Sequence, residues 1–168
     1  MAKVNKKARI LFLCTGNSCR SQMAEGWARH LKPNEIEAYS AGIKKRGLDP
    51  LAVRVMAEAG VDISGQRSKT IDDLPEHTFD WVITLCGHAN ETCPIFPGGT
   101  QRMHMGFDDP PALAKEASTK EEVLGHYRRV RDEIRGFIER LPGGLVSPER
   151  MVHRPMRREI WMRRQQKN

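Results

Sequence analysis

The sequence predicts an α/β fold, in which a four-stranded parallel sheet is flanked by helices. Apolar runs of strand length alternate with helical patterns, as is typical of a parallel sheet covered on both faces. The 168 residues suffice for one domain with its own core. No apolar stretch approaches the ~20 residues that a membrane-spanning helix needs, so we expect no membrane span.

The first predicted elements are a strand, a helix and a second strand. Residues 8–14 form an apolar run that indicates a buried strand. A helical pattern follows over residues 21–32 and ends before Pro33. Residues 36–41 alternate in polarity and predict the second strand.

The middle of the chain predicts a helix and then a third strand. Asp49 and Pro50 open a helix that runs to Ala59, because Asp is a preferred N-cap and Pro fits the first turn. Gly60 follows its end, as is common after a helix. Residues 79–85 are mostly apolar and predict a buried strand.

The last predicted elements are a strand and a long helix. Residues 102–107 indicate the fourth strand. Ser118 is expected to cap a helix that runs to about residue 141, and Glu121 completes a capping box. We therefore place the domain at residues 1–141, with a C-terminal extension at 142–168.

The net charge of +7 is concentrated in this extension, where the residues from Gly143 onward carry seven Lys and Arg against two Glu. The body is only mildly basic, so we expect it to have no nucleic-acid partner. Met156, Ile160 and Trp161 could form a short basic amphipathic helix, although a solvated tail is the simpler interpretation.

Few cysteines and no secretory signal favour a cytoplasmic protein. Four cysteines in 168 residues do not make a disulfide framework and suit a reducing compartment. The basic N-terminus precedes an apolar run that is short and lacks a small-residue cleavage pattern. We expect a cytoplasmic monomer.

A thiol stands where the first strand meets the first helix. Cys14 ends the apolar run, a loop with Gly16 follows, and Arg20 and Ser21 stand at the helix start. Free N–H groups and the positive dipole end at a helix start stabilise an oxyanion and lower the pKa of a thiol. The guanidinium adds a planar fork of donors. We therefore predict a reactive Cys14 thiolate beside an oxyanion site, with Ser21 as helix N-cap and hydrogen-bond donor to the sulfur.

Two more reactive residues follow predicted strands. Cys86 comes after the third strand and Asp109 after the fourth, so both should reach the same sheet edge as Cys14. A carboxyl there can act as general acid, and Asp108 is the rival for that role.

Cys93 follows Cys86 by seven residues. If the segment between them is helical, the two lie roughly 10 Å apart. A disulfide needs Cα atoms within ~7 Å, so that segment would have to unwind. Two buried structural thiols are the alternative. The cysteine spacings do not match a zinc site, and we predict no metal.

The segment from Cys14 to Trp27, Cys-Thr-Gly-Asn-Ser-Cys-Arg-Ser-Gln-Met-Ala-Glu-Gly-Trp, resembles the signature of thioredoxin-coupled arsenate reductases. These enzymes share the low-molecular-weight protein tyrosine phosphatase fold. The similarity covers about residues 8–141, and the other matching segments are 39–43, 82–86, 93–94 and 106–110.

The resemblance implies a three-cysteine relay. Cys14 attacks arsenate, of which phosphate and sulfate are mimics, and Asp109 protonates the departing oxygen. Cys86 then forms a disulfide with Cys14 as arsenite leaves. Cys93 attacks Cys86, which frees Cys14 and gives a Cys86–Cys93 disulfide. Thioredoxin reduces that disulfide. No tightly bound cofactor is implied. The residues implied to bind the substrate are Thr15, Gly16, Asn17, Ser18, Cys19, Arg20 and Ser21.

Some family members bind potassium at positions matching Asn17, Glu25, Ser40 and a downstream acidic residue. This chain has Lys69 at the last of these positions. We expect the lysine ammonium to replace the cation, without potassium dependence.

Two other functions remain open. A phosphatase would need only Cys14, Arg20 and Asp109 and has no use for a relay pair. Reduction of arsenic(V) needs two electrons, which a dithiol supplies on becoming a disulfide, so the additional cysteines favour a reductase. The other alternative is a thiol redox sensor.

Overall fold

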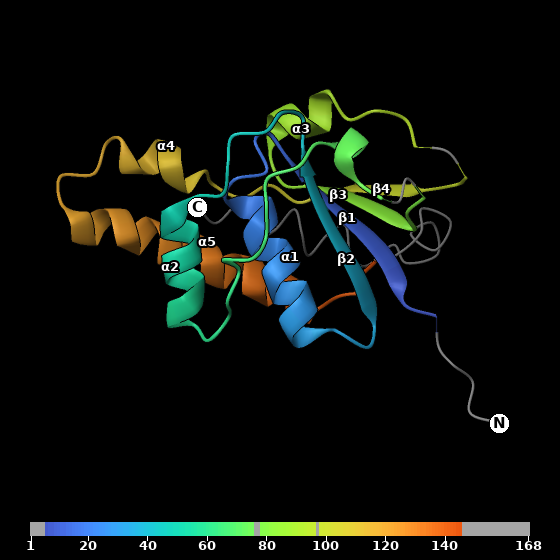
Figure 1. Cartoon of the computed structure of the whole chain (residues 1–168), viewed down its shortest axis with the longest axis horizontal. Helices are drawn as coiled ribbons and strands as arrows, with labels where there is room; N and C mark the ends of the chain where they lie inside the picture. The colour runs from blue at the N-terminus through green and yellow to red at the C-terminus, as the bar shows by residue number, and fades with distance from the viewer. Residues whose placement is uncertain (1–5, 76–77, 97, 146–168) are drawn as a thin grey trace, which may run out of the picture.

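A computed structural model of the chain describes residues 6–75, 78–96 and 98–145. The sheet has four parallel strands, as predicted, and their order is β2-β1-β3-β4 (Figure 1). The strands are β1 (Ala8–Cys14), β2 (Ile36–Gly42), β3 (Trp81–Thr84) and β4 (Gln101–His104). The helices are α1 (Arg20–Leu31), α2 (Pro50–Glu58), α3 (Gly87–Glu91), α4 (Pro110–Ala114) and α5 (Lys120–Glu139), with a 3-10 turn η1 (Ile71–Asp73).

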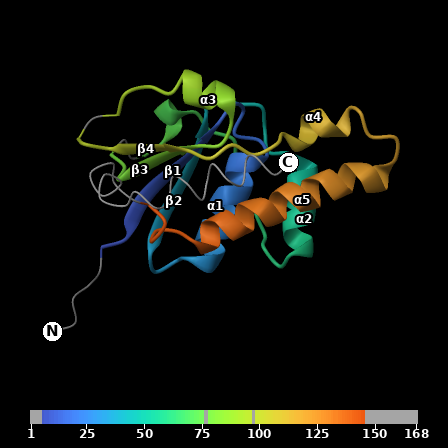
Figure 2. The same ribbon diagram turned by 180° about the vertical axis from the view of Figure 1, so that it is seen from behind.

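The two faces of the sheet carry separate cores, because alternate side chains of β1 point in opposite directions. Ile10 and Phe12 pack with Trp27 of α1 and Ile134 of α5. Leu11 and Leu13 belong to the core on the opposite face, together with Leu74, Phe79 and Val82. Figure 2 shows α5 and α1 lying across one side of the sheet.

Several predicted boundaries needed correction. Strands β3 and β4 are each four residues long, shorter than predicted, because their parallel pairing covers only those four positions. α4 was not predicted, although Asp109 before Pro110 repeats the Asp-Pro start seen at α2. Its single turn is too short to show a helical period.

The N-cap of α5 is one residue later than predicted. The Thr119 hydroxyl accepts the backbone N–H of Glu122 at 3.1 Å, and the Glu122 carboxylate accepts the backbone N–H of Ser118 at 2.8 Å. The capping residues are therefore Thr119 and Glu122 in place of Ser118 and Glu121. The sequence could not distinguish the two pairs, because each has a hydroxyl residue three positions before a glutamate.

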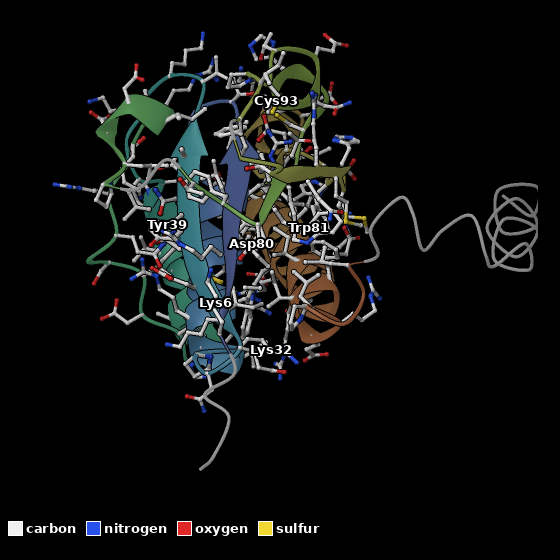
Figure 3. The ribbon with its side chains drawn as sticks, turned by 90° about the vertical axis from the view of Figure 1, so that its right-hand side faces the viewer. Lys6, Lys32, Tyr39, Asp80, Trp81 and Cys93 are labelled. Carbon is white, nitrogen blue, oxygen red and sulfur yellow. The ribbon has the colours of Figure 1, made fainter. Side chains whose placement is uncertain are left out.

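The strand order reverses at the carboxyl ends of β1 and β3. The chain leaves β1 to form β2 on one side and later places β3 on the other side. Ligands of open α/β sheets bind at such a point. Figure 3 shows Cys93 at the sheet end to which the strand arrows point and Lys32 at the opposite end.

Among the described residues, no helix combines the length and apolarity needed to cross a bilayer. Met156, Ile160 and Trp161, which we considered for a tail helix, lie outside the described residues. The domain boundary at residue 141 stays a prediction, although α5 ends close to it, at Glu139.

Candidate active site

The segment after β2, residues 43–46, donates hydrogen bonds to the carbonyl oxygens at the start of the loop between β1 and α1. The backbone N–H groups of Ile43, Lys44 and Arg46 donate to the carbonyls of residues 14, 15 and 16 at 3.2, 3.0 and 3.0 Å. In a trans peptide the N–H points away from the carbonyl of the same unit. The N–H groups of residues 15–17 therefore turn to the opposite side, where they can bind an anion.

Asn17 is the strained residue of this loop. Its φ of 45° lies in the left-handed region, which a non-glycine residue adopts at a cost. Its side-chain amide is buried and donates to the hydroxyls of Ser21 and Ser40 at 2.8 and 3.0 Å. Gly42 permits the close approach of β2, because a Cβ there would lie 2.7 Å from the Asn17 nitrogen.

Arg20 is buried at the start of α1 and faces an acid. Its Nη1 donates to the Phe107 carbonyl at 3.0 Å, and its Nη2 lies 3.5 Å from Oδ1 of Asp109. Its Nε is buried without a partner among the described residues. The guanidinium thus keeps a donor for an incoming oxyanion while it orients Asp109.

The two candidate acids have different surroundings. Asp109 is the N-cap residue of α4 and turns toward Arg20. Asp108 instead forms an ion pair with Arg129 of α5 at 3.0 Å, and its side chain is 63% exposed. Of the two carboxyls, only Asp109 is placed against the guanidinium of the loop.

Cys14 and Cys86 lie close together, although 72 positions of sequence separate them. The hydroxyl of Thr15, the residue after Cys14, lies 3.1 Å from the Cys86 Sγ, and both thiols belong to one buried cluster. The neighbouring Cys86 thiol, followed by burial, raises the pKa of Cys14 well above its ordinary value. The neighbouring Cys14 thiol, helped by Thr15 and the Ala89 amide, lowers the pKa of Cys86 to about 5.

The balance of these effects favours the charge of the resting pair on Cys86. Arg20 and the Thr15 amide lower the pKa of Cys14, as the sequence argument requires, but the neighbouring sulfur and burial outweigh them. Two interacting thiols titrate as a unit, so the Cys14 thiolate stays a prediction for the state with a bound oxyanion.

The contacts around Cys86 favour a thiolate. The Thr15 hydroxyl oxygen lies 3.1 Å from its Sγ, and the Ala89 N–H donates to the same sulfur at 3.4 Å. Cys86 is the N-cap residue of α3. Thr15 and Cys86 are 71 positions apart, so no local sequence pattern could predict the contact between this hydroxyl and the Cys86 sulfur.

Cys93 is the more accessible member of the predicted relay pair. It lies two residues beyond α3, is half-buried, and its thiol contacts the Pro94 carbonyl at 3.6 Å. Burial raises its pKa. The segment between Cys86 and Cys93, for which a helix was only one possibility, contains the helix α3, so the two residues lie at opposite ends of a short helix. All four cysteines are reduced.

Two loop residues differ from their predicted roles. α1 begins at Arg20, so Ser21 lies within the first turn and Cys19 occupies the N-cap position. The Ser21 hydroxyl accepts a hydrogen bond from the Asn17 amide. Cys19 is buried, and desolvation raises its pKa. Neither side chain caps the helix.

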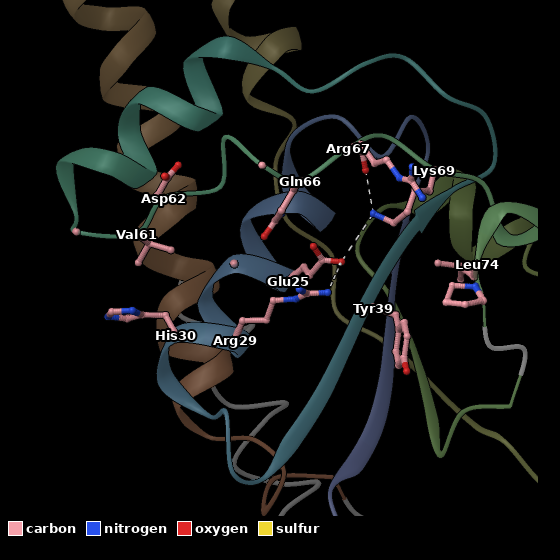
Figure 4. A pocket seen from close by; sticks show the side chains of 14 residues that line it. Glu25, Arg29, His30, Tyr39, Val61, Asp62, Gln66, Arg67, Lys69 and Leu74 are labelled. Atoms are coloured by element: carbon pink, nitrogen blue, oxygen red, sulfur yellow. Dashed lines mark hydrogen bonds and ion pairs between the residues drawn. The ribbon is translucent and has the colours of Figure 1, made fainter.

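Lys69, the residue predicted to replace a potassium ion, places its ammonium beside Glu25 of α1. The Lys69 ammonium is 3.8 Å from the buried Glu25 carboxylate and donates to the Arg67 carbonyl at 2.8 Å (Figure 4). The Ser40 hydroxyl donates to the same carboxylate at 3.2 Å. Glu25, Arg67 and Lys69 line a cavity of about 710 Å³. No cluster of three metal-binding side chains occurs within the described ranges.

Comparison with known proteins places the chain in a family. The low molecular weight phosphotyrosine protein phosphatase family matches residues 9–145. An arsenate reductase of Halalkalibacterium halodurans is 54% identical over 131 residues, which cover 78% of this chain and 91% of that protein.

Solved structures agree with the sequence relatives. An arsenate reductase in the phosphate binding state is 33% identical, with a TM-score of 0.64, over 80% of this chain and 95% of that one. An arsenate reductase in oxidized state is 32% identical, with a TM-score of 0.65, over 79% and 95% of the two chains. This chain therefore belongs to the low molecular weight phosphotyrosine protein phosphatase family and, within it, is similar to proteins named arsenate reductase.

Proposed function

We propose that this protein reduces arsenate to arsenite by a relay of three cysteines, with a thioredoxin-like protein as electron donor. The observation that carries this proposal is the position of the Cys86 sulfur at the anion-binding loop, 3.1 Å from the hydroxyl of Thr15 and in one buried cluster with Cys14. A phosphatase needs one sulfur at this loop. A second sulfur beside the first supplies the dithiol that transfer of two electrons requires.

The first step joins arsenate to Cys14. The loop N–H groups and Arg20 hold the oxyanion, and Cys86 is the acceptor available for the Cys14 proton. The Cys14 sulfur attacks arsenic(V), and one oxygen leaves as water after Asp109 protonates it. An S–As bond forms and an As–O bond breaks, without a change of oxidation state. Stabilisation of the developing charge by fixed donors lowers the barrier.

The second step is the reduction. Cys86 first releases to water the proton that it took from Cys14, and its thiolate, stabilised by Thr15 and the Ala89 N–H, then attacks the Cys14 sulfur. The electron pair of the S–As bond stays on arsenic, which leaves as arsenite. The two cysteines together lose two electrons and become a disulfide.

The third step moves the disulfide outward. Cys93 attacks Cys86, and Cys14 leaves as a thiol after it takes up a proton. This exchange requires α3 to unwind, since its two ends must come within disulfide distance. A helix of five residues has little stability of its own, so unwinding it should cost little free energy. An external dithiol then reduces the bond between Cys86 and Cys93.

The test is thioredoxin-coupled NADPH consumption with and without arsenate. We expect arsenate-dependent turnover in the wild type and none with Cys14→Ser, Cys86→Ser or Cys93→Ser. Cys19→Ser is the comparison variant: it removes a thiol of the anion-binding loop that has no part in the relay, so it should change arsenate affinity only and leave multiple turnover intact. Sustained turnover without Cys86 or Cys93 would exclude the relay.

Hydrolysis of phosphomonoesters is the second candidate, favoured by the family and by Arg20 and Asp109 at the loop. We expect it as a weak side activity, because phosphate and arsenate are nearly isosteric. It should survive Cys93→Ser, whereas multiple-turnover arsenate reduction should stop.

We also propose that the Lys69 ammonium takes the place of a potassium ion beside Glu25. Activity should then be equal in potassium and sodium at the same ionic strength. Lys69→Asp should create a potassium dependence by restoring an anionic ligand, and Lys69→Met should not. Strong activation of the wild type by potassium would contradict this role.

A further inference from the structure

Gln22 lies outside the anion-binding loop, yet it is fully buried against it. Its Nε2 donates to the Asn17 carbonyl at 3.0 Å and to the Asn17 Oδ1 at 2.9 Å. The same nitrogen lies 2.8 Å from the Arg67 carbonyl. An amide nitrogen has two hydrogens, so one of them is shared between acceptors. Gln22 thus donates hydrogen bonds to both the backbone and the side chain of Asn17, the strained loop residue.

A second glutamine determines which way the Gln22 amide faces. The Gln66 Nε2 donates to the Gln22 carbonyl at 3.0 Å and to the Gln22 Oε1 at 2.8 Å. Figure 4 shows Gln66 directed toward α1 from the far side of the cavity. Because Oε1 is held on the Gln66 side, the NH₂ group of Gln22 is turned to Asn17.

The Asn17 conformation determines the direction of its own N–H and of the next one. Its left-handed φ persists only if its surroundings impose it. Ser21, Ser40 and the Lys69 N–H complete the contacts of its amide, and within the described part of the chain Gln22 alone also donates to its carbonyl. Loss of Gln22 would free the backbone at the point where the anion binds.

We propose that Gln22 is a positioning residue of the oxyanion site and that Gln66 orients it. The proposal rests on the oxyanion-binding role of the loop given above. Neither side chain contacts the anion. Their contribution is to keep the loop amides preorganised, so that binding requires no rearrangement.

The first test is Gln22→Met, which keeps the length of the side chain and removes the donors. We expect inorganic phosphate to bind about tenfold more weakly by calorimetry, the consequence of lost hydrogen bonds to buried acceptors. Gln101→Met at the opposite end of the sheet is the matched control and should bind phosphate like the wild type. Phosphate affinity within about twofold of wild type in folded Gln22→Met protein would overturn the proposal.

Gln22→Glu adds a readout that a merely structural role would not give. A carboxylate would face the oxygens of Asn17 and Arg67, and burial beside them would raise its pKa. Phosphate affinity relative to wild type should be low at neutral pH and recover as the pH falls, because the protonated carboxyl can donate again. A constant ratio across pH would contradict the positioning role.

Gln66→Glu tests the same proposal without a change at residue 22, and so serves if the Gln22 variants do not fold. A glutamate there can only accept, so the Gln22 amide should reverse and turn its oxygen toward Asn17. We expect phosphate binding to weaken several-fold, although residue 66 is remote from the anion, and Gln66→Met to have a smaller effect. Wild-type affinity in Gln66→Glu would overturn the proposal. Failure of arsenate reduction alone would contradict the relay and leave this inference standing.

Discussion

Removal of the Thr15 hydroxyl should shift the pH dependence of the second chemical step. This hydroxyl lies 3.1 Å from the Cys86 sulfur, which carries the charge of the resting pair. Thr15→Val keeps the branched shape of the side chain and removes the hydrogen bond. Thr15→Ser is the matched control, because it keeps the hydroxyl.

The size of the shift follows from the charge on the sulfur. A hydrogen bond to a charged group contributes about 1.5–3 kcal/mol. Since one pKa unit corresponds to about 1.4 kcal/mol, the loss should raise the pKa of Cys86 by about one to two units. In the resting protein, where the pKa is about 5, the thiolate fraction at pH 6 would fall from about nine-tenths to between one-tenth and one-half. In the arsenate-loaded state Cys14 is bonded to arsenic and no longer lowers the pKa of Cys86, so the midpoint of the pH profile should start higher and still move by about one to two units.

The assay is the single-turnover rate of arsenite release, measured as a function of pH in arsenate-loaded enzyme. The rate depends on the Cys86 thiolate, so it is present above the pKa of that group and is lost as the pH falls through it. The midpoint should move upward in Thr15→Val and stay in place in Thr15→Ser. An unchanged midpoint in Thr15→Val would refute the assignment of the charge to Cys86.

Three further outcomes test the site and the fold. Asp109→Asn should slow phosphomonoester hydrolysis by about 10²–10⁴-fold, whereas Asp108→Asn should have little effect because that carboxyl pairs with Arg129; equal losses would contradict the choice of acid. Gly42→Ala should weaken phosphate binding and lower the free energy of unfolding by about 1–3 kcal/mol in urea titrations, since its Cβ would lie 2.5 Å from the Lys44 carbonyl oxygen. Gly125→Ala, in an open position of α5, should instead stabilise the protein by up to ~1 kcal/mol. Ile134→Ala should cost about 2–5 kcal/mol by the same measurement, because the side chain is fully buried between α5 and the sheet.

The sequence alone determined the order of the elements and the edge of the sheet at which chemistry occurs. Strand and helix periods are local, so residues 8–14 and the helix after Asp49 could be recognised from a short window. The rule that ligands gather at the carboxyl ends of parallel strands then brought Cys14, Cys86 and Asp109 together without any knowledge of side-chain positions.

Only the tertiary structure decided how the charges and protons are arranged at that edge. The sulfur of Cys86 takes the charge from Cys14, Asp109 rather than Asp108 meets Arg20, and Gln22 holds Asn17. Most of these contacts join segments far apart in the chain, as with Thr15 and Cys86. Hydrogen bonds depend on differences of a few tenths of an ångström, and packing of the whole core, rather than any local pattern, determines positions at that scale.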